Sequence, residues 1–293
     1  MEDILTALAS RLKRKDNSAN KGTNGTLTVA AGSELYRGAA ALASSAALRC
    51  GVGIVRLVSV EKVISSAAAR LPECVFLPTE SENGAMSYRD FARKMPAFSK
   101  SRAVLAGCGM TDCTDTGNII AELIKYGGYQ LIIDADGLNS IKNRPELLKS
   151  AALPPVITPH IGEMARLTGA STDAIKSDRE KTAAEFSRKY NCITVLKDCK
   201  TVISSPEGKL FVCDRPNAGL AKGGSGDVLS GIISSFAAQG YDAFDAAVCG
   251  AALHSLAAES AREKLTEYSM LPSDIVAEIP GVFARIGKTR NYR

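Results

Sequence analysis

The sequence contains no tryptophan, and aromatic residues make up only 5% of its 293 positions. Hydrophobic residues nevertheless account for 45% of the chain and charged residues for 23%, which is the profile of a globular protein. The core must therefore be built from Ala, Val, Ile and Leu. Such small side chains suit close packing of helices on a sheet. We expect a single domain spanning residues 1–293.

Histidine and paired cysteine are also scarce. The chain has two histidines, His160 and His254, and none of its eight cysteines belongs to a C-x-x-C pair, which argues against a zinc site. The first residues include Glu2 and Asp3, unlike a secretory signal peptide. We therefore expect reduced, mostly buried thiols in a cytoplasmic protein.

The sequence also lacks a hydrophobic run long enough to cross a membrane. Its formal charge is +5, but Lys and Arg are scattered among acidic residues, and the clearest basic cluster is residues 13–15. The aromatic residues that accompany basic ones on RNA-binding surfaces are missing. Neither a membrane nor a nucleic acid is expected as a partner, and the basic excess suits a solvated surface near an anionic nucleotide.

Short apolar runs alternate with amphipathic segments along the chain. Strands are predicted at 26–31, 54–60, 103–106, 131–133, 155–158 and 193–196, and a hairpin at 201–204 and 210–213. Helices are predicted at 2–15, 34–50, 118–126, 161–167 and 177–190, and two long helices at 226–239 and 243–264 close the chain. Residues 78–88 are predicted to be a polar loop. The alternation predicts an α/β fold, with a mostly parallel central sheet flanked by helices on both faces.

Several predicted strands end in a glycine or a polar residue. These residues are Gly32, Gly107, Asp134, His160 and Lys197. The carboxyl ends of parallel strands meet at one edge of a sheet, where ligands bind in open α/β folds. The sequence therefore predicts a functional site along this edge.

The strongest local signal is Gly223-Gly224-Ser225-Gly226-Asp227, which runs directly into apolar residues with helical spacing. Glycines allow the backbone to approach a ligand closely, and the N–H groups at a helix N-terminus are unpaired. Gly224, Ser225 and Gly226 are therefore predicted to form an anion hole for phosphate oxygens. The loop is not a Walker A loop, because Lys222 precedes the glycines instead of following them.

Asp227 has two interpretations. An Asp at the start of a helix often caps it, by accepting hydrogen bonds from the first backbone N–H groups. A carboxylate beside a bound phosphate can instead take the proton of an attacking hydroxyl. The surrounding glycines and the polar strand ends favour the base.

The glycine segment resembles the G-G-[ST]-G-D signature of ribokinase-like enzymes, and four more segments are similar to those of NAD(P)H-hydrate dehydratases. They are G-S-x-x-Y-R-G-A-A at 32–40, D-A-D-G-L-N at 134–139, T-P-H-x-G-E at 158–163 and K-D-C-K-T at 197–201. Their order and spacing agree with that family over about residues 20–285. The set is far more specific than any one motif.

The resemblance implies a ribokinase-like fold and the nucleotide-dependent dehydration of (6S)-NADHX and NADPHX to NADH and NADPH. ADP, or alternatively ATP, would phosphorylate the C6 hydroxyl with Mg²⁺ as cofactor, and phosphate would then leave. Asp227 would be the catalytic base. The implied substrate contacts are Ala39, Ala40, Gly109, His160 and Asp227, and the implied nucleotide contacts are Lys197, Asp198, Cys199, Lys200, Thr201 and Gly226.

Other residues keep two interpretations at this stage. Asp134 and Asp136 either cap the turn that follows them or hold a magnesium–nucleotide complex through water. His160 is either a substrate contact or a hydrogen-bonded structural residue, whereas His254 is interpreted as packing. Glu163 either orients its neighbourhood or starts a helix.

The chain departs from the family pattern at three positions. Thr111 stands where a glycine often follows the central strand, Asp198 where the nucleotide segment usually has glycine, and Lys222 where a threonine is common. The epimerase domain of many bacterial members is expected to be absent, so a separate epimerase would act in the same pathway. The resemblance also suggests a homotetramer. Alternative functions are a ribokinase-like kinase of a vitamin precursor and a catalytically silent nucleotide-binding regulator.

Overall fold

The computed structural model describes residues 3–289. The strands of its main sheet are β1 (Thr26–Ala30), β2 (Ile54–Val60), β3 (Val75–Thr79), β6 (Ala103–Ala106), β7 (Gln130–Ile133), β8 (Val156–Ile157), β9 (Ile193–Leu196), β10 (Thr201–Ser204) and β11 (Leu210–Cys213). They lie in the order β11-β10-β9-β8-β7-β6-β1-β2-β3. All neighbours from β9 to β3 are parallel, and the hairpin β10–β11 adds two antiparallel strands at one edge.

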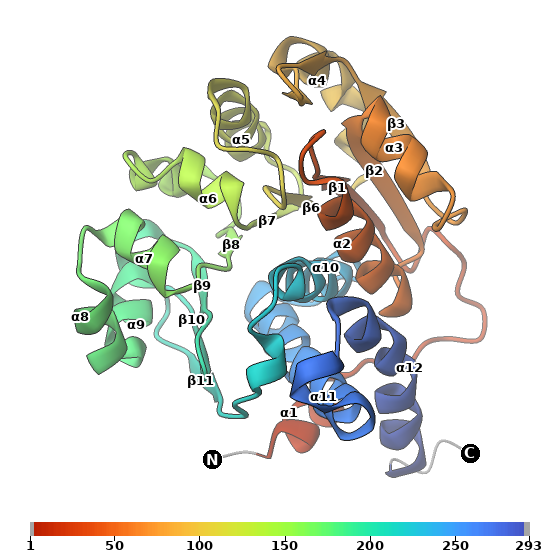
Figure 1. Cartoon of the computed structure of the whole chain (residues 1–293), viewed down its shortest axis with the longest axis vertical. Helices are drawn as coiled ribbons and strands as arrows, with labels where there is room; N and C mark the ends of the chain where they lie inside the picture. The colour runs from red at the N-terminus through yellow and green to blue at the C-terminus, as the bar shows by residue number, and fades with distance from the viewer. Residues whose placement is uncertain (1–2, 290–293) are drawn as a thin grey trace.

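Helices cover both faces of this sheet. They are α1 (Ile4–Arg11), α2 (Arg37–Arg49), α3 (Glu61–Ala68), α4 (Tyr88–Lys94), α5 (Thr114–Tyr126), α6 (Asp136–Ser140), α7 (Ile161–Thr168), α8 (Thr172–Ser177), α9 (Arg179–Tyr190), α10 (Ser225–Ala238), α11 (Ala243–Ser269) and α12 (Pro272–Thr289). Short 3₁₀ turns are η1 (Met95–Lys100), η2 (Pro145–Ser150) and η3 (Ala218–Leu220). Figure 1 shows α5, α6, α7 and α9 on one side of the sheet and α2, α10 and α11 on the other. The predicted α/β architecture is confirmed.

The central strands are short, continuous apolar runs because both of their faces are covered. Every residue of β1, β6 and β9 is buried, as expected for parallel strands between two helical layers. Helix α10 lies beneath this sheet, and its residues 228–238 are all buried. Gly231 allows α10 to approach α2 closely, since a Cβ there would lie 2.2 Å from the Ala43 carbonyl oxygen. The small residues thus allow the close packing of helices and sheet that the sequence predicted.

The strand order reverses between β1 and β6. From β1 the chain moves outward through β2 and β3, and it returns through β6 on the other side of β1. Such a reversal is the place where ligands bind in open α/β folds, at the carboxyl ends of the strands. Gly32 and Cys108 flank this point and are joined by a 2.8 Å backbone hydrogen bond. The fold thus places the reversal of strand order where the sequence predicts a site.

The prediction of a polar loop at residues 78–88 is wrong. Its first residues belong to β3, and a small hairpin of β4 (Ser81–Glu82) and β5 (Ala85–Met86) follows before α4 begins. The turn consists of Asn83 and Gly84, with φ values of 50° and 84°. An Asn-Gly pair with two positive φ values is the preferred two-residue hairpin turn, so the signal was present in the sequence.

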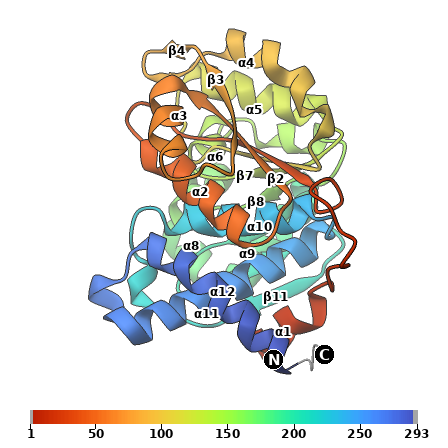
Figure 2. The ribbon, with the colours of Figure 1, turned by 90° about the vertical axis from the view of Figure 1, so that its right-hand side faces the viewer.

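The prediction that two long helices close the chain is also wrong, because α12 follows them. Pro272 begins that helix, where a missing N–H costs nothing, and Pro280 lies inside it. The structure also adds α3, β3, α4, α6 and α8, which have no counterpart among the predicted elements. Figure 2 shows α12 beside α11.

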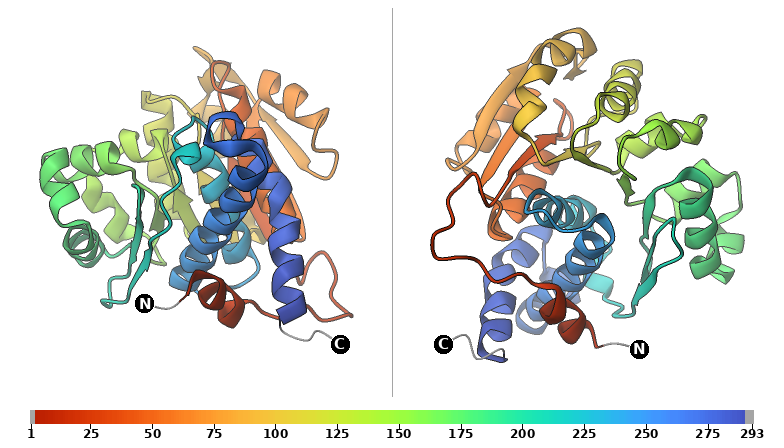
Figure 3. Two further views of the ribbon diagram at one scale, coloured as in Figure 1. Left: turned by 60° about the horizontal axis from the view of Figure 1, so that its bottom comes forward. Right: turned by 180° about the vertical axis from the view of Figure 1, so that it is seen from behind.

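Helix α1 packs on α11, although the two are distant in sequence (Figure 3). Arg11 ties them together through a 3.1 Å ion pair with Asp245. Between residues 3 and 289, no helix combines the length and the apolar character needed to span a membrane.

Candidate active site

The glycine segment adopts the geometry of an anion hole. Gly224 caps α10 with a φ of 102°, a left-handed conformation that favours glycine. Ser225, Gly226 and Asp227 form the first turn of the helix. Because the cap residue is Gly224 and no side chain caps this helix, the interpretation of Asp227 as a cap is wrong. Its carboxyl group is left for another role.

A buried ion pair lies beside this helix start. Asp134 follows β7 and is 1% exposed, and its Oδ1 accepts a 2.8 Å hydrogen bond from Lys197 Nζ after β9. Its other oxygen accepts a 2.7 Å hydrogen bond from the Ser230 hydroxyl, one turn beyond Asp227. Burial alone would raise the pKa of Asp134, but the Lys197 ammonium outweighs it, so the pKa is lowered. Asp134 is therefore an ionised carboxylate at the carboxyl ends of the parallel strands, and both of its oxygens accept hydrogen bonds.

Asp227 is perturbed in the opposite direction. Its carboxyl group is desolvated and lies near the Asp134 carboxylate, and these two causes raise its pKa from 3.8 to about 7. The Cys108 thiol and Lys197 lower the pKa in part. The ligand atoms of Cys108, Asp134 and Asp227 all lie within 4.8 Å of one another. A carboxyl group whose pKa lies near neutrality is well suited to act as a general base.

Gly226 keeps the space above this cluster open. A Cβ at Gly226 would lie 3.2 Å from Lys197 Nζ and 3.7 Å from Asp134 Oδ2. Any side chain here would stand between the helix start and the ion pair. Because Gly226 has no side chain, there is space for an anion between the backbone N–H groups at the helix start and the Lys197 ammonium.

His160 is placed at the same sheet edge by a bridge between His160 and Lys197 that extends the pairing of β8 and β9. Its Nδ1 accepts a 2.9 Å hydrogen bond from the Gly162 N–H, and Glu163 Oε2 accepts one from the His160 N–H. This capping box starts α7. Half of the His160 side chain, 52%, remains exposed beside the site. His160 is thus a structural cap that still has surface to offer a ligand, and Glu163 both starts the helix and orients His160.

The predicted substrate-binding residues Ala39, Ala40 and Gly109 lie close together beside the segments that leave β1 and β6. Gly109 has a φ of 62°, and a Cβ there would lie 2.9 Å from the Ala39 Cβ. Ala40 lies deeper and is fully buried, 3.2 Å from the position of a Cβ on Gly32. Ala39 and Gly109 are partly exposed, whereas Ala40 offers a ligand no exposed surface.

Two of the departures from the family pattern have visible compensations. Thr111 has a φ of 75°, the left-handed conformation that a glycine would adopt at lower cost. Its N–H donates to Asp136 Oδ2 at 2.9 Å and its hydroxyl donates to the Ser33 hydroxyl at 3.1 Å. Lys222 turns away from the site, and its Nζ donates to the carbonyl oxygens of Tyr268 and Met270. These bonds hold the unusual residues in place.

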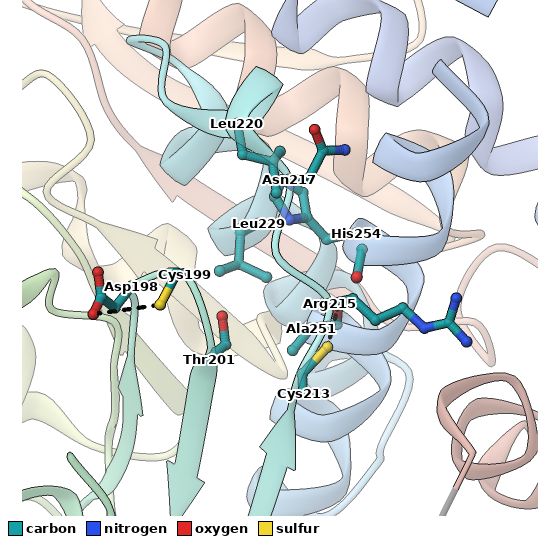
Figure 4. Close-up of a pocket in the computed structure, with 11 residues that line it drawn as sticks. Asp198, Cys199, Thr201, Cys213, Arg215, Asn217, Leu220, Leu229, Ala251 and His254 are labelled. Atoms are coloured by element: carbon teal, nitrogen blue, oxygen red, sulfur yellow. Dashed lines mark hydrogen bonds between the residues drawn. The ribbon is translucent and has the colours of Figure 1, made fainter. Parts of the chain in front are cut away.

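The predicted nucleotide segment borders a small pocket of about 60 Å³ between β10, β11, η3 and α11 (Figure 4). Asp198, Cys199 and Thr201 line it. Asp198 has no positive φ and pairs with Arg179 Nε at 2.7 Å, so its backbone does not need the usual glycine. Lys200 does not line this pocket, and it forms an ion pair with Asp214 at 2.6 Å. Lys197 does not line this pocket either, because its ammonium group bonds Asp134.

The two aspartates proposed for a metal have different surroundings. Ala135 between them has a φ of 49°, a strained conformation that turns the chain sharply. Asp134 then bonds Lys197 and Ser230, while Asp136 begins α6 and accepts from Thr111. Burial raises the pKa of the half-buried Asp136. Both oxygens of Asp134 are used by the protein itself, so direct coordination of Mg²⁺ by Asp134 does not fit. A water-mediated role fits Asp136 better, and neither residue caps the helix with its side chain.

Sequence reasoning missed two residues of the cluster, Ser230 and Cys108. Ser230 lies three positions after Asp227, the spacing that puts two residues on one helix face, so the signal was available. Cys108 follows β6, and its thiol donates to Asp134 Oδ2 at 3.7 Å. Nothing in the sequence distinguishes it from the other buried cysteines. All eight cysteines are free, and six are buried, as predicted.

The chain is similar to known proteins of one family. A sequence profile of NAD(P)H-hydrate dehydratases matches residues 27–281. An ADP-dependent (S)-NAD(P)H-hydrate dehydratase of Xanthomonas campestris is 30% identical over 286 residues, which cover 97% of each chain. The chain belongs to the NAD(P)H-hydrate dehydratase family. Other curated relatives are bifunctional NAD(P)H-hydrate repair enzymes, of whose length the chain spans about half.

Solved structures agree with this family and fold. An ADP/ATP-dependent NAD(P)H-hydrate dehydratase from Bacillus subtilis, crystallised with ATP and Mg²⁺, superposes with a TM-score of 0.82 at 26% identity. The superposition covers 95% of this chain and 96% of that one. A ribokinase-like protein of Enterococcus faecalis reaches a TM-score of 0.83 at 22% identity and covers 96% of this chain and 94% of its own. The fold of this NAD(P)H-hydrate dehydratase family member is ribokinase-like.

Proposed function

We propose that this chain uses a nucleotide, most readily ADP, to dehydrate (6S)-NADHX and NADPHX to NADH and NADPH. One observation carries the proposal: a carboxyl group with a pKa of about 7, Asp227, stands in the first turn of a helix whose N-terminus is open to an anion. A base and a phosphate site within one turn are what transfer of a phosphoryl group to a hydroxyl requires. Membership of the family supplies the identity of the hydroxyl compound.

In the first step, Asp227 takes the proton of the C6 hydroxyl while the hydroxyl oxygen attacks the terminal phosphorus of the nucleotide. The bond from that phosphorus to the bridging oxygen breaks, and AMP leaves when the donor is ADP. Negative charge then develops beside the backbone N–H groups of Ser225 and Gly226, of which the Ser225 N–H already makes a 3.3 Å hydrogen bond to the Lys222 carbonyl oxygen. These donors are held in place by the helix, so they need not reorganise as the charge appears.

In the second step, the bond between C6 and the phosphate oxygen breaks. The lone pair of the ring nitrogen forms a double bond to C6, and phosphate departs with the electrons of the broken bond. Loss of a proton from the neighbouring ring carbon then restores the dihydronicotinamide. Phosphate leaves far more readily than hydroxide does, which explains why a nucleotide is consumed.

The residues around the base hold the ligands of this reaction. Ala39, Ala40, Gly109 and His160 would contact the hydrated cofactor, and residues 197–201 with Gly226 would contact the nucleotide. Asp136 would hold Mg²⁺ through water. The ion would bind together with the nucleotide phosphates, whose negative charge it would neutralise. Lys197 supplies a fixed positive charge next to Asp134.

The proposal predicts a nucleotide-dependent rise in absorbance at about 340 nm, where reduced nicotinamide absorbs. The purified protein is mixed with hydrated NADH and Mg²⁺, and ADP, ATP and no nucleotide are compared. We expect a rise with ADP or ATP and none without nucleotide. A stable phosphorylated product with no rise would identify a small-molecule kinase instead, and nucleotide binding without any turnover would identify a regulator.

The pH dependence of kcat tests the role assigned to Asp227. The base works only as a carboxylate, and its pKa is raised to about 7 by burial and by the Asp134 carboxylate. We therefore expect kcat to increase through about pH 7 and to fall about tenfold per pH unit below it. A profile that stays flat down to pH 5 would contradict this role. The measurement is a series of initial rates at saturating substrate and nucleotide.

A further inference from the structure

One edge of the main sheet is open to a further strand. Strand β11 ends the sheet and pairs only with β10 (Figure 1). The Ser205 N–H donates to the Lys209 carbonyl oxygen, which sets the alternation of hydrogen-bonded and non-hydrogen-bonded pairs along this hairpin. In the register of the hairpin, Leu210 and Val212 then fall in non-hydrogen-bonded pairs, so their N–H and C=O groups point away from β10. Within residues 3–289 these groups have no hydrogen-bond partner.

The residues of this edge do not discourage pairing with another strand. Exposed edge strands act as templates for further strands, and proteins usually protect them with proline, charges or bulges. The opposite edge strand, β3, contains the exposed Pro78. Strand β11 has the sequence Leu-Phe-Val-Cys, without proline or charge, and Leu210 is 45% exposed. A groove of about 460 Å³ borders residues 210–212, so this edge is accessible.

We propose that β11 is an interface between two copies of this chain, in which it pairs antiparallel with β11 of a second copy across a two-fold axis at Phe211. In this register the outward groups of Leu210 bond those of Val212 of the partner subunit, and the symmetric pair forms at the same time. Phe211 lies opposite the partner's Phe211 in a non-hydrogen-bonded pair, where side chains approach most closely. Every directly opposed pair of this core is apolar, and aromatic pairs across strands are stabilising.

The edge is complementary to itself in this register and not in the neighbouring ones. With the axis one residue later, Leu210 would face the charged Asp214 of the partner subunit. Lys209 would then face Arg215 of the partner subunit, and like charges in direct opposition are destabilising. With the axis one residue earlier, Gly208 would have to pair, but its φ of 89° is not that of an extended strand. A two-fold interface of one patch with itself is the commonest form of protein dimer. The inference goes beyond the proposed function and does not depend on it.

Val212→Pro tests the pairing without breaking the hairpin. Because the Val212 N–H points outward, proline removes only a bond to the second copy, and edge strands tolerate proline at such positions. We expect the wild type to sediment as an even-numbered assembly of 30.8 kDa chains, and Val212→Pro to halve its mass. Leu210→Lys should do the same by placing a charge in the interface. The matched control is Leu153→Lys, because Leu153 is 47% exposed and borders a different cavity. That variant should keep the wild-type mass.

The sedimentation results can also contradict the interface. An unchanged mass in both Val212→Pro and Leu210→Lys would overturn the proposal. A wild type that sediments as a monomer at micromolar concentration would overturn it as well. These measurements use the protein without nucleotide or hydrated cofactor, so they stand whatever the 340 nm assay shows.

Cysteine cross-linking tests the register itself. Opposed residues of a non-hydrogen-bonded pair have Cα atoms about 4.5 Å apart, which suits a disulfide. Phe211→Cys should therefore yield a covalent dimer when dissolved oxygen oxidises the two thiols. Leu210→Cys should not, because the two copies of that residue are diagonal neighbours with Cβ atoms about 7–8 Å apart. The wild type is the blank for its own exposed Cys199. Equal cross-linking of both variants, or none in Phe211→Cys, would overturn the proposal.

Discussion

Replacing Asp227 with Asn is expected to lower kcat by about 10²- to 10⁴-fold, the usual contribution of a general base. Asn has the same shape but cannot take the proton of the C6 hydroxyl. The initial rate is measured by absorbance at about 340 nm, and nucleotide affinity is measured by calorimetry. Affinity should change little, since the anion hole uses backbone N–H groups. Activity close to that of the wild type would remove Asp227 from the mechanism.

The same variant should be more stable than the wild type, which distinguishes lost chemistry from a damaged fold. The pKa of Asp227 is 3.8 in the unfolded chain and about 7 in the folded one. The folded state therefore binds more protons between these values, so wild-type stability falls as pH rises from about 4 to 7. Above pH 7, Asp227→Asn should gain about 2–4 kcal/mol in the free energy of unfolding. At pH 4 the gain should disappear.

The second large effect is expected from Lys197→Met. This change removes the partner of Asp134, which is 1% exposed and therefore cannot be solvated in place of the lost ammonium. Breaking a buried pair from one side typically costs about 3–5 kcal/mol. Denaturant titration at pH 8 should show a loss of this size. The loss should shrink at low pH, where Asp134 becomes protonated and its charge disappears.

The double variant Lys197→Met with Asp134→Asn provides the control. It removes both charges, and the amide oxygen introduced at position 134 can still accept the hydrogen bond of the Ser230 hydroxyl. Most of the lost stability should return, although activity should stay low because the fixed positive charge is gone. If the single and double variants unfold at the same denaturant concentration, the ion pair contributes little to stability.

The sheet was predictable from the sequence because most of its strands are continuous apolar runs. Strands β2, β6, β9, β10 and β11 begin and end at the predicted residues. Short helices such as α6 and α8 were missed, since one or two turns carry too little periodicity to register. Helix α12 was missed because Pro280 interrupts its pattern; Pro280 itself is exposed, and the helix is held against the fold by the buried Ile275, Ile279 and Ile286.

The candidate site was predictable where it depends on strand ends. Asp134, His160 and Lys197 each follow a strand, so parallel pairing alone brings them to one edge. Ser230 comes from a helix and reaches the site through a contact that no local pattern encodes. The hydroxyl of Ser230 bonds a carboxylate 96 positions away in the chain. Such contacts depend on how α10 and α11 pack beneath the sheet.

The contacts around the glycine segment also set the order in which the site matures during synthesis. A Cβ at Gly224 would lie 3.2 Å from Pro272, Met270 packs against Gly219, and Lys222 bonds the Met270 carbonyl. On the ribosome, the glycine segment emerges well before residues 268–272, which hold it in shape. We therefore expect the phosphate site to take its final shape only after the corner between α11 and α12 has docked.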